Sequence, residues 1–560
     1  MSDLNKDLAD KFYNLLHNKQ YERLQFEVDM LGSIKEQHSL VKFYYASSIF
    51  LKDTSKEKEL LLASDLFEEV HISNKNHLQS LYNMIAVSFK TKVFRKVLPL
   101  TLKAFEKNPD DVKLIEGLAR INFFLGNRKE SIQLFRQLYK MFPDKIEGRF
   151  PFVSSLNYSS GISQEEYLKE CLEFSSLVEK KFKIENDNFK FSNKINDKIK
   201  VAFISADFRT HSVSHFLKGL LKRINKSNFE IILISNLKVL EQDDLSRQLM
   251  KLASGWHDVA EYSDNDLVIF LRSLNLDILF DLSGFTSGNR FEVIARRCAK
   301  VQIEWLGYNN TLGIKNMDYL IADKNLINKD EFNLYKEKIL FLPKIWNVFA
   351  PPEILPDIEL KEKNNNTVFK FCSFNNYQKI SNRTVNVWSE ILKHKNSQLL
   401  LKTSHAGDID DLKDNILDKF MNNGVSRDQI IFLNREKNIH DHLKLYNKAN
   451  IALDTFPYPG VTTSFEAIMM GVPVLTMKGF NMNSRCGESI NKNLGMKDFI
   501  AIDNDDYILK ATSLCENVDY ITKIRKTLRD KAKNSPLFDV DKFGDDFSEL
   551  MINLWKKNSD

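Results

Sequence analysis

The sequence is poor in cysteine, and its few cysteines form neither a disulfide pattern nor a metal-binding pattern. Five cysteines are scattered over 560 residues without a CxxC pair. An odd number of scattered thiols argues against a disulfide framework or a zinc knuckle and is typical of a reducing compartment. The cytoplasm is therefore the expected location. The five residues are Cys171, Cys298, Cys372, Cys486 and Cys515.

Long apolar runs and strong net charge are also missing. No run reaches the roughly 18 apolar residues of a membrane span. The first residues, MSDLNKDLADKF, lack the apolar centre of a signal peptide. The formal net charge of +5 is small for this length, and the basic residues form no concentrated patch. We expect no membrane span and no nucleic-acid partner.

Several catalytic motifs are absent. No HExxH, GxSxG or P-loop pattern occurs, which argues against zincins, α/β-hydrolases and P-loop NTPases. Acidic runs at 264–266, 408–410 and 503–506 have the composition of a metal-binding DxD motif. They stand where helices are expected to begin, and not directly after strands. We interpret them as helix caps and predict no metal site.

The front of the chain, to about residue 180, has a helical pattern with internal repetition. Pro109 and Pro143 stand 34 positions apart, and small and apolar residues recur between them. This spacing resembles a tetratricopeptide repeat, in which stacked helix pairs form a concave surface. We predict such a domain over residues 1–183, where an acceptor protein or peptide would bind. The alternative is an irregular helical domain that only supports the rest of the chain.

The remainder alternates short apolar strands with helices. A polar segment at 184–198 is a predicted linker, and a proline-containing segment at 349–366 is a predicted hinge. Between and after them, residues 199–348 and 367–560 each predict a doubly wound α/β lobe. Ligands of such sheets bind at the carboxyl ends of the strands, so the loops there are the candidate sites.

Three of these loops carry side chains suited to phosphate or proton chemistry. SADFRTHSVSHF contains His211, an imidazole that could remove or orient a proton. SFNNYQKIS contains Lys379, which could neutralise a diphosphate beside a helix N-terminus. DTFPYPGVTTSFEAIMMG joins a strand to a helix whose first N–H groups could bind an anion. The alternative for this last segment is a structural capping box between Thr463 and Glu466.

Taken together, these loops resemble one family. SADFRTHSVSHF, WLGYNNTLGIKNMDYLIAD, SFNNYQKIS, HDHLKLYNKANIALDTFPYPGVTTSFEAIMMGVPVLT and SPLFDVDKF are similar to the protein O-linked N-acetylglucosamine transferases, and most to their SPINDLY-type branch. The resemblance runs in order from about Lys198 to Trp555. It implies a GT-B fold of two Rossmann-like lobes and an inverting, metal-independent protein O-glycosyltransferase. The repeats ahead of the lobes also match the family's layout.

The resemblance also implies roles for individual residues. His211 falls on a histidine that acts as base or orients the acceptor, and Lys379 on the lysine that binds the diphosphate. His442 falls on the histidine packed against the nucleotide base. The predicted nucleotide-sugar site comprises Asn376, Lys379, His442, Gly460, Thr462, Thr463 and Glu466, in which the two threonines hold the phosphates and Glu466 binds the ribose hydroxyls.

Two departures from the family leave the donor open. Val461 stands where N-acetylglucosamine transferases usually carry histidine, and Glu466 where they often have aspartate. UDP-N-acetylglucosamine is the expected co-substrate, without a cofactor or metal, and transfer to Ser or Thr is the expected reaction. GDP-fucose, used by a SPINDLY-like O-fucosyltransferase, is the alternative donor. A GT-B enzyme acting on a glycan or small molecule, and an inactive scaffold, are the other hypotheses.

Overall fold

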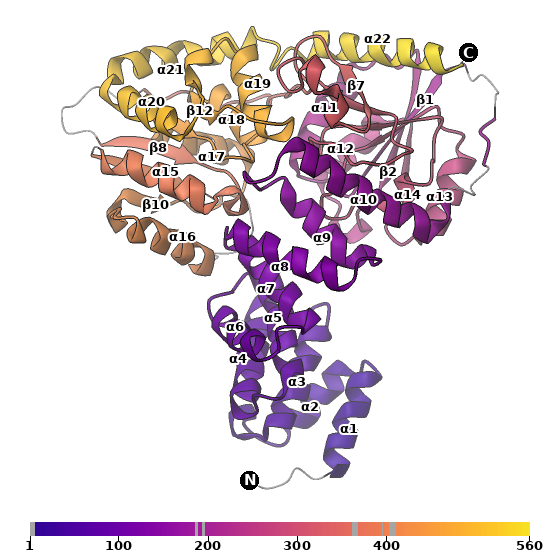
Figure 1. The fold of residues 1–560 in the computed structure, drawn as a ribbon, viewed down its shortest axis with the longest axis vertical. Helices are drawn as coiled ribbons and strands as arrows, with labels where there is room; N and C mark the ends of the chain where they lie inside the picture. Colours follow the sequence, from indigo (N-terminus) through magenta and orange to yellow (C-terminus); the bar gives the residue numbers. More distant parts are fainter. Residues whose placement is uncertain are drawn as a thin grey trace. The chain divides into compact units, whose positions relative to one another are not determined.

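The protein is described by a computed structural model that covers residues 6–184, 189–192, 197–360, 368–394, 396–402 and 410–559. These residues form two compact units. The first contains the chain up to Met141 together with α16 (Asp410–Asn422) as far as Lys419. The second contains both β-sheets and the helices around them (Figure 1).

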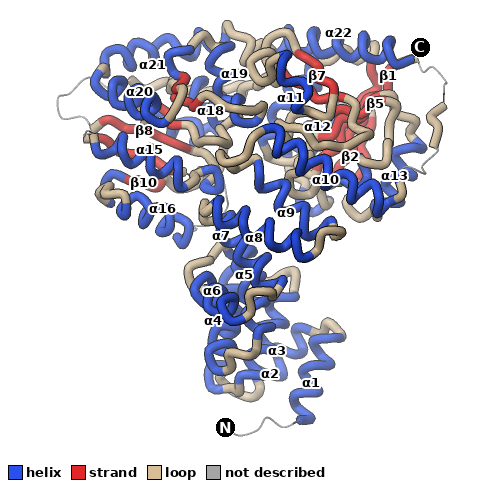
Figure 2. Tube along the Cα trace, viewed as in Figure 1, coloured by secondary structure: helices blue, strands red, loops and turns tan. Residues whose placement is uncertain are grey.

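In its described residues the first unit is built from helices and loops (Figure 2). α5 begins at Leu78 and α7 at Val112, 34 positions later, in agreement with the spacing of the prolines. The helices up to Met141 are α1 (Lys6–His17), α2 (Tyr21–Asp29), α3 (Ser39–Leu51), α4 (Glu57–Ser73), α5 (Leu78–Thr91), α6 (Val97–Lys107), α7 (Val112–Phe124) and α8 (Arg128–Met141).

The repeated small and apolar positions form the core between these helices. Ser131 on α8 is fully buried, and its hydroxyl donates to the Ala119 carbonyl of α7 at 2.7 Å, so the two helices approach closely. The prediction of a helical repeat region is confirmed. Its buried positions include Leu81, Phe94, Val97, Ala104, Leu118, Ala119, Leu125, Phe135 and Leu138.

The helix α16 follows β9 in sequence, yet its first residues pack on the repeats. The backbone N–H of Arg95 donates to the Asp411 carboxylate at 2.7 Å, and the Arg95 guanidinium pairs with Asp418 at 2.8 Å. At the end of α7, Asn415 and Lys419 donate to the Leu125 carbonyl. Backbone groups at helix ends of the repeats are thus satisfied by α16, which the sequence did not predict.

In the second unit, a parallel sheet of seven strands forms the first lobe. The order is β3-β2-β1-β4-β5-β6-β7, so the chain runs outward from β1 first in one direction and then in the other. β3 and β6, each four residues long, were not predicted. The strands are β1 (Ile199–Ser205), β2 (Phe229–Ser235), β3 (Gly255–Asp258), β4 (Ile278–Asp281), β5 (Val301–Glu304), β6 (Tyr319–Ala322) and β7 (Lys338–Phe341). Its helices are α11 (Ser212–Arg223), α12 (Asp244–Leu252), α13 (Asp264–Ser273) and α14 (Phe291–Ile294).

The second lobe repeats this arrangement with six parallel strands in the order β10-β9-β8-β11-β12-β13. The strands are β8 (Phe369–Ser373), β9 (Ser397–Leu401), β10 (Ile430–Phe432), β11 (Ile451–Leu453), β12 (Val474–Met477) and β13 (Ile500–Ala501). Its helices are α15 (Asn382–Lys393), α17 (Ile439–Lys444), α18 (Thr462–Met469), α19 (Cys486–Asn493), α20 (Asn504–Glu516) and α21 (Val518–Lys533). Two Rossmann-like lobes were predicted, and both are present.

Three further helices complete the second unit. The last helix, α22 (Val540–Ser559), returns to the first lobe and packs on α11, as Figure 1 shows. There the Phe547 ring lies 5.5 Å from Phe280 and 5.1 Å from Trp305. α9 (Ile146–Leu156) and α10 (Gln164–Phe182) also belong to this unit. The division between units therefore falls at Met141, before the predicted domain boundary at 183.

Parts of the predicted connections lie outside the described residues. These are 185–188 and 193–196 of the linker and 361–366 of the hinge. The described part of the hinge is well packed, since Phe349 is buried against Phe465 and Phe538.

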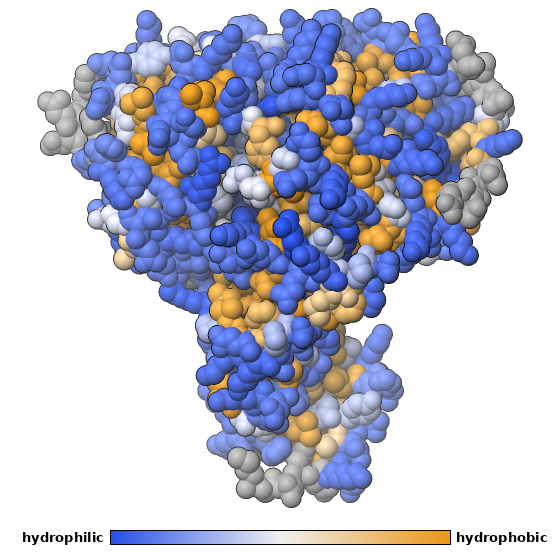
Figure 3. All heavy atoms as spheres, in the orientation of Figure 1, coloured by the Kyte–Doolittle hydropathy of each residue, from blue (hydrophilic) through white to orange (hydrophobic). Residues whose placement is uncertain are grey.

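Surface polarity and helix composition agree with the absence of long apolar runs. No described helix is both long enough and apolar enough to cross a membrane. On the face that Figure 3 shows, hydrophilic residues predominate and apolar ones form scattered groups. The acidic run at 503–506 caps α20 through Asp503, as predicted, whereas the run at 264–266 forms the first turn of α13, whose N-cap is Ser263. In the third, residues 408 and 409 lie outside the described residues.

Candidate nucleotide-sugar site

The candidate site lies in the second lobe where the strand order reverses. β8 has β9 on one side and β11 on the other, so the loops that follow β8 and β11 diverge at this point. A crevice forms there in doubly wound sheets because consecutive connections cover opposite faces. The loop after β8 carries Asn375, Asn376 and Lys379, and the loop after β11 runs from Asp454 to Val461.

Asp454 organises the turn between β11 and α18. Its Oδ1 accepts from the Gly460 N–H at 2.6 Å and the Thr455 N–H at 3.0 Å, and its Oδ2 accepts from the Thr476 hydroxyl at 2.8 Å. Burial raises the pKa of Asp454 to about 6, although these hydrogen bonds favour the charged form. The carboxyl group folds the turn back, so that Gly460 lies beside the helix start.

The N-terminus of α18 is open. Val461 is the N-cap and provides no side-chain hydrogen bond. Among the described residues, the backbone N–H groups of Thr462 and Thr463 have no hydrogen-bond acceptor. The Thr463 hydroxyl instead donates to Asn375 Oδ1 at 2.7 Å. The capping-box alternative is therefore wrong, and the helix start keeps donors for a ligand.

Gly460 leaves room at this helix start. A Cβ atom at position 460 would lie 2.4 Å from Thr463 Oγ1 and 2.6 Å from Asn375 Oδ1. Any side chain there would displace the groups that form the cradle. Asn376 has a different position, because its Oδ1 accepts from the Gln378 N–H at 3.0 Å and caps a short turn. Asn375, and not Asn376, reaches Gly460 and Thr463.

Lys379 brings a cation to the same cradle. Its Nζ donates to the Pro459 carbonyl at 2.8 Å and lies 4.2 Å from the centre of the Tyr458 ring. Within the described residues, Lys379 takes part in no ion pair. Burial lowers the pKa of Lys379 to about 8, against the effect of the Asp454 carboxylate, which raises it. The ammonium is thus poorly compensated and suited to binding an anion.

A second group of polar side chains lies beside the first turns of α18. His442 Nε2 is 2.9 Å from Glu466 Oε2, and His442 Nδ1 is 2.8 Å from Lys402 Nζ. Because an ammonium can only donate, Nδ1 is the acceptor and Nε2 carries the proton donated to Glu466. The Tyr446 hydroxyl lies 3.3 Å from the same carboxylate oxygen. This chain of hydrogen bonds orients the His442 ring.

His211 lies in the first lobe, at the N-cap of α11. Its Nδ1 accepts from the Val213 N–H at 3.4 Å and is 3.6 Å from the Asp207 carboxylate. The side chain is 44% exposed. Desolvation of the ring lowers the pKa of His211, although Asp207 acts in the opposite direction. The lowered pKa favours the neutral ring, which can accept a proton.

α11 connects His211 with the second lobe. Phe216 of α11 packs on Phe465 of α18 with 5.4 Å between ring centres. Burial lowers the pKa of His215, which lies one turn after His211, while the charge of Glu466 raises it. The electric fields of His211 and Glu466 therefore both act on His215. The two lobes thus place His211, His215 and Glu466 around one region.

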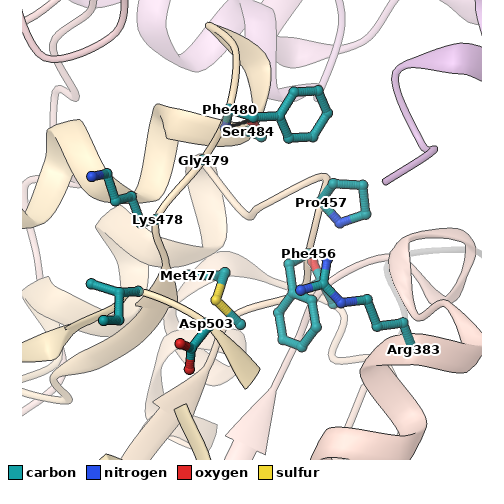
Figure 4. Close-up of a pocket in the computed structure, with 11 residues that line it drawn as sticks. Arg383, Phe456, Pro457, Met477, Lys478, Gly479, Phe480, Ser484 and Asp503 are labelled. Carbon is teal, nitrogen blue, oxygen red and sulfur yellow. Dashed lines mark hydrogen bonds between the residues drawn. The ribbon is translucent and has the colours of Figure 1, made fainter. Parts of the chain in front are cut away.

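A small pocket of about 110 Å³ opens on the other side of the loop after β11. In Figure 4 the Arg383 guanidinium points toward Phe456 and Pro457, whereas the Lys478 side chain points away from them. Arg383 donates to Asn504 Oδ1 at 2.7 Å, which holds it in the wall. None of the predicted site residues lines this pocket.

Sequence reasoning missed part of the site. Asp454 follows an apolar strand segment and Tyr446 precedes it, and neither was assigned a role. Lys402 stands at the end of a predicted strand and was not assigned a role either. The sequence did offer a signal for Asp454, because an acidic residue there directly follows a strand. For Tyr446 and Lys402 the sequence offers none, since their positions depend on how α17 and β9 pack.

The class is defined by two doubly wound sheets, with an open helix start and a lysine at the switch point of the second sheet. This is a glycosyltransferase fold of the two-lobed GT-B type. The chain matches Glycosyl transferase family 41 over residues 160–368 and 362–547, and it belongs to this family.

Curated relatives agree with this assignment. The chain is 31% identical over 365 residues to the "Probable UDP-N-acetylglucosamine--peptide N-acetylglucosaminyltransferase SPINDLY" of Arabidopsis thaliana, a match that covers 64% of this chain and 40% of the relative. A relative of the same name in Solanum lycopersicum is 29% identical over 365 residues, covering 64% and 39%. The chain therefore spans about two fifths of the length of these relatives.

A solved structure supports the fold. A mutant of the O-GlcNAc transferase of Thermobaculum terrenum superposes with a TM-score of 0.79 at 22% identity. The match covers 93% of this chain and 99% of that chain. The shared architecture extends through the helical region and both lobes.

Proposed function

We propose that the protein is an inverting, metal-independent protein O-glycosyltransferase. It would transfer N-acetylglucosamine from UDP-N-acetylglucosamine to Ser or Thr hydroxyl groups of acceptor proteins. The observation that carries the proposal is the open N-terminus of α18 beside Lys379. Relatives named as N-acetylglucosaminyltransferases support this choice of donor and reaction.

The donor diphosphate fits the cradle by charge and by hydrogen bonding. Thr462 and Thr463 offer two backbone N–H donors, and the helix dipole adds partial positive charge there. The Lys379 ammonium supplies a full positive charge at the same place. As the bond from the anomeric carbon to the phosphate oxygen breaks, negative charge grows on the diphosphate. Positive groups already in place stabilise that charge without reorganisation.

The nucleoside half would extend toward α17. His442, fixed by Lys402, presents a ring on which the base could pack. Glu466 Oε2 is occupied by His442, but Oε1 has no hydrogen-bond partner in the described part of the chain. That oxygen could accept a ribose hydroxyl. Lys379, His442, Thr462, Thr463 and Glu466 would then each bind a different part of the donor.

The acceptor hydroxyl would approach from the side of the first lobe. His211 is exposed and oriented by its place at the N-cap of α11. It could take the hydroxyl proton while the oxygen attacks the anomeric carbon opposite the leaving diphosphate. Attack from the opposite face inverts the configuration at that carbon. The first product is the same whether His211 removes the proton or only orients the hydroxyl.

A second donor, GDP-fucose, is favoured by one observation. Val461 at the N-cap provides no side chain that could hydrogen-bond to a sugar or phosphate, where N-acetylglucosamine transferases usually carry histidine. We regard protein O-fucosyl transfer as the second candidate function, and transfer to a glycan or small molecule as the third. The repeats would guide the acceptor polypeptide, and the expected compartment is the cytoplasm.

Comparing donors directly tests the proposal. Purified full-length protein would be incubated with UDP-N-acetylglucosamine, UDP-glucose or GDP-fucose in EDTA, and nucleotide release would be measured. Co-expressed acceptor candidates would be weighed by intact mass spectrometry. Release from UDP-N-acetylglucosamine with a matching mass increase on protein supports the first candidate. Nucleotide release from GDP-fucose alone supports the second candidate function. If EDTA abolishes all activity and Mg²⁺ restores it, the reaction is not metal-independent.

A further inference from the structure

The connection between α9 and α10 reaches both lobes of the second unit. Asn310 of the first lobe donates to Asn157 Oδ1 at 2.8 Å, and Gln164 donates to Asn310 Oδ1 at 2.8 Å. Asn483 of the second lobe donates to the Asn157 carbonyl at 3.5 Å. Asn157, Gln164 and Asn310 are each at most 5% exposed. This connection is therefore fixed in place between the lobes by buried hydrogen bonds.

Tyr158, the next residue, touches the donor cradle. Its ring lies 4.6 Å from the Tyr458 ring at an angle of 33°. Tyr458 is the ring over which the Lys379 ammonium lies, at 4.2 Å. Burial and the nearby Tyr158 hydroxyl raise the pKa of the Tyr458 phenol, so the ring stays neutral. An aromatic pair thus connects a helical segment outside the two sheets with the cation of the cradle.

Lys379 depends on this ring for its position. Its ammonium also donates to the Pro459 carbonyl, and both contacts come from the loop after β11. Inside the loop, the Thr455 hydroxyl donates to the Tyr458 carbonyl at 2.8 Å, which holds the backbone but not the ring. Tyr158 contacts the ring from outside the loop. Without it, Tyr458 could rotate and water could reach the ammonium.

We propose that Tyr158 is a positioning residue of the donor site, which holds the Tyr458 ring against Lys379. The inference rests on the proposed function, because it assigns the lysine to the leaving diphosphate. It agrees with the place of α9 and α10 in the same compact unit as the lobes. A helical segment that precedes the lobes in sequence would contribute directly to the catalytic cradle.

Two substitutions separate the ring from the hydroxyl. Tyr158→Ala removes the aromatic contact, whereas Tyr158→Phe keeps it and serves as the matched control. Nucleotide release would be followed from pH 6 to 10. For Tyr158→Ala we expect kcat/KM to fall by about three- to tenfold, the size of a lost aromatic contact. Tyr158→Phe should stay within about twofold of the wild type.

A second measurement follows Lys379 itself and needs no turnover. Trace acetylation with acetic anhydride at a series of pH values, read by peptide mass spectrometry, gives the titration of each lysine. In the wild type Lys379 should titrate near its pKa of about 8. In Tyr158→Ala water enters, and the pKa should rise toward the ordinary value of about 10.4. Tyr158→Phe should titrate as the wild type does.

The outcomes for Tyr158 and for the proposed function can be told apart. If Tyr158→Ala leaves the titration and labelling rate of Lys379 unchanged, the inference is wrong even when the wild type is active. If the wild type releases no nucleotide and binds no UDP, the proposed function is wrong, and the labelling still decides the role of Tyr158. Should Tyr158→Ala fail to fold by circular dichroism, Tyr158→Leu replaces it, since leucine keeps apolar volume without the ring.

Discussion

The two lobes share one strand order but differ at the point where it reverses. In the first lobe β4 ends at Asp281, whose carboxylate accepts from the Ser283 N–H at 3.0 Å and the Gly284 N–H at 3.1 Å. In the second lobe Asp454 follows β11 and accepts from two backbone N–H groups in the same manner. An acidic residue thus folds the turn at both positions.

What surrounds the two turns is different. Asp281 lies opposite Glu304 of β5, and burial together with Asp281 raises the pKa of Glu304 well above its usual value. The helix that follows, α14, has only four residues. In the second lobe the neighbouring loop supplies Lys379, and α18 has eight residues with an open start. The first arrangement places buried carboxyl groups at the turn, whereas the second places a cation beside an open helix start, so loops rather than topology distinguish the two lobes.

The largest effect should follow from removing the cation of the second lobe. We expect Lys379→Ala to lower kcat for nucleotide release by about 10²- to 10³-fold, as for loss of one group that stabilises a developing anion. Lys419→Ala is the matched control, because burial also lowers the pKa of Lys419 to about 8 while its contacts are to Leu125 and Asn127. A decrease of less than about threefold for Lys379→Ala would remove it from the mechanism.

The contribution of the first lobe is tested at His211. His211→Ala should lower kcat by about 10²-fold, within the usual range for a group that accepts or orients a proton. UDP affinity, measured by calorimetry, should change by less than about twofold, because the proposed function assigns His211 to the acceptor and not to the donor. A large loss of UDP affinity with unchanged kcat at saturation would move His211 to the donor site.

Paired glycine substitutions compare the two turns. Gly460→Ala places a Cβ among Thr463 and Asn375 and should weaken UDP binding by about tenfold with little change in melting temperature. Gly284 has a φ of +51°, and a Cβ there would lie 2.5 Å from Tyr308. Gly284→Ala should therefore lower the melting temperature and leave UDP affinity unchanged. The opposite pattern would place the nucleotide in the first lobe.

The last effect concerns stability and pH. Burial raises the pKa of Asp281 to about 6 in the folded protein, above the value of about 3.9 for an unfolded chain. Its neutral form therefore contributes stability that is complete below about pH 4 and is lost as pH rises through 6. Between pH 4 and 7 the wild type should lose on the order of 2 kcal/mol relative to Asp281→Asn. Urea unfolding at both pH values measures this, and equal changes in both proteins would show that Asp281 does not titrate.

Much of this arrangement follows from the sequence, because alternating strands and helices are local patterns. The strands that begin with Ile199 and Phe369, and the helix start at Thr462, were predicted from short apolar runs, prolines and a glycine. The capping box failed because Thr463 bonds to Asn375, which is 88 residues away in sequence. The period of a helix does not reveal such a partner.

Contacts between distant segments account for the other differences. The repeat pattern offered no reason to place α9 and α10 with the lobes, since their periodicity is that of any amphipathic helix. Tyr158 acquires its contact only when the α9–α10 connection is fixed between the two lobes. In the same way, α16 looks like an ordinary surface helix of an α/β lobe until Asp411 and Asp418 meet Arg95.

The central claim is that the second lobe alone binds the donor diphosphate, at the start of α18 beside Lys379. A crystal structure of the protein with UDP tests it most directly. We predict that diphosphate oxygens accept hydrogen bonds from the backbone N–H groups of Thr462 and Thr463 and lie within ion-pair distance of Lys379 Nζ. A diphosphate bound instead at the ends of β1 and β4, near Asp281, would contradict this account.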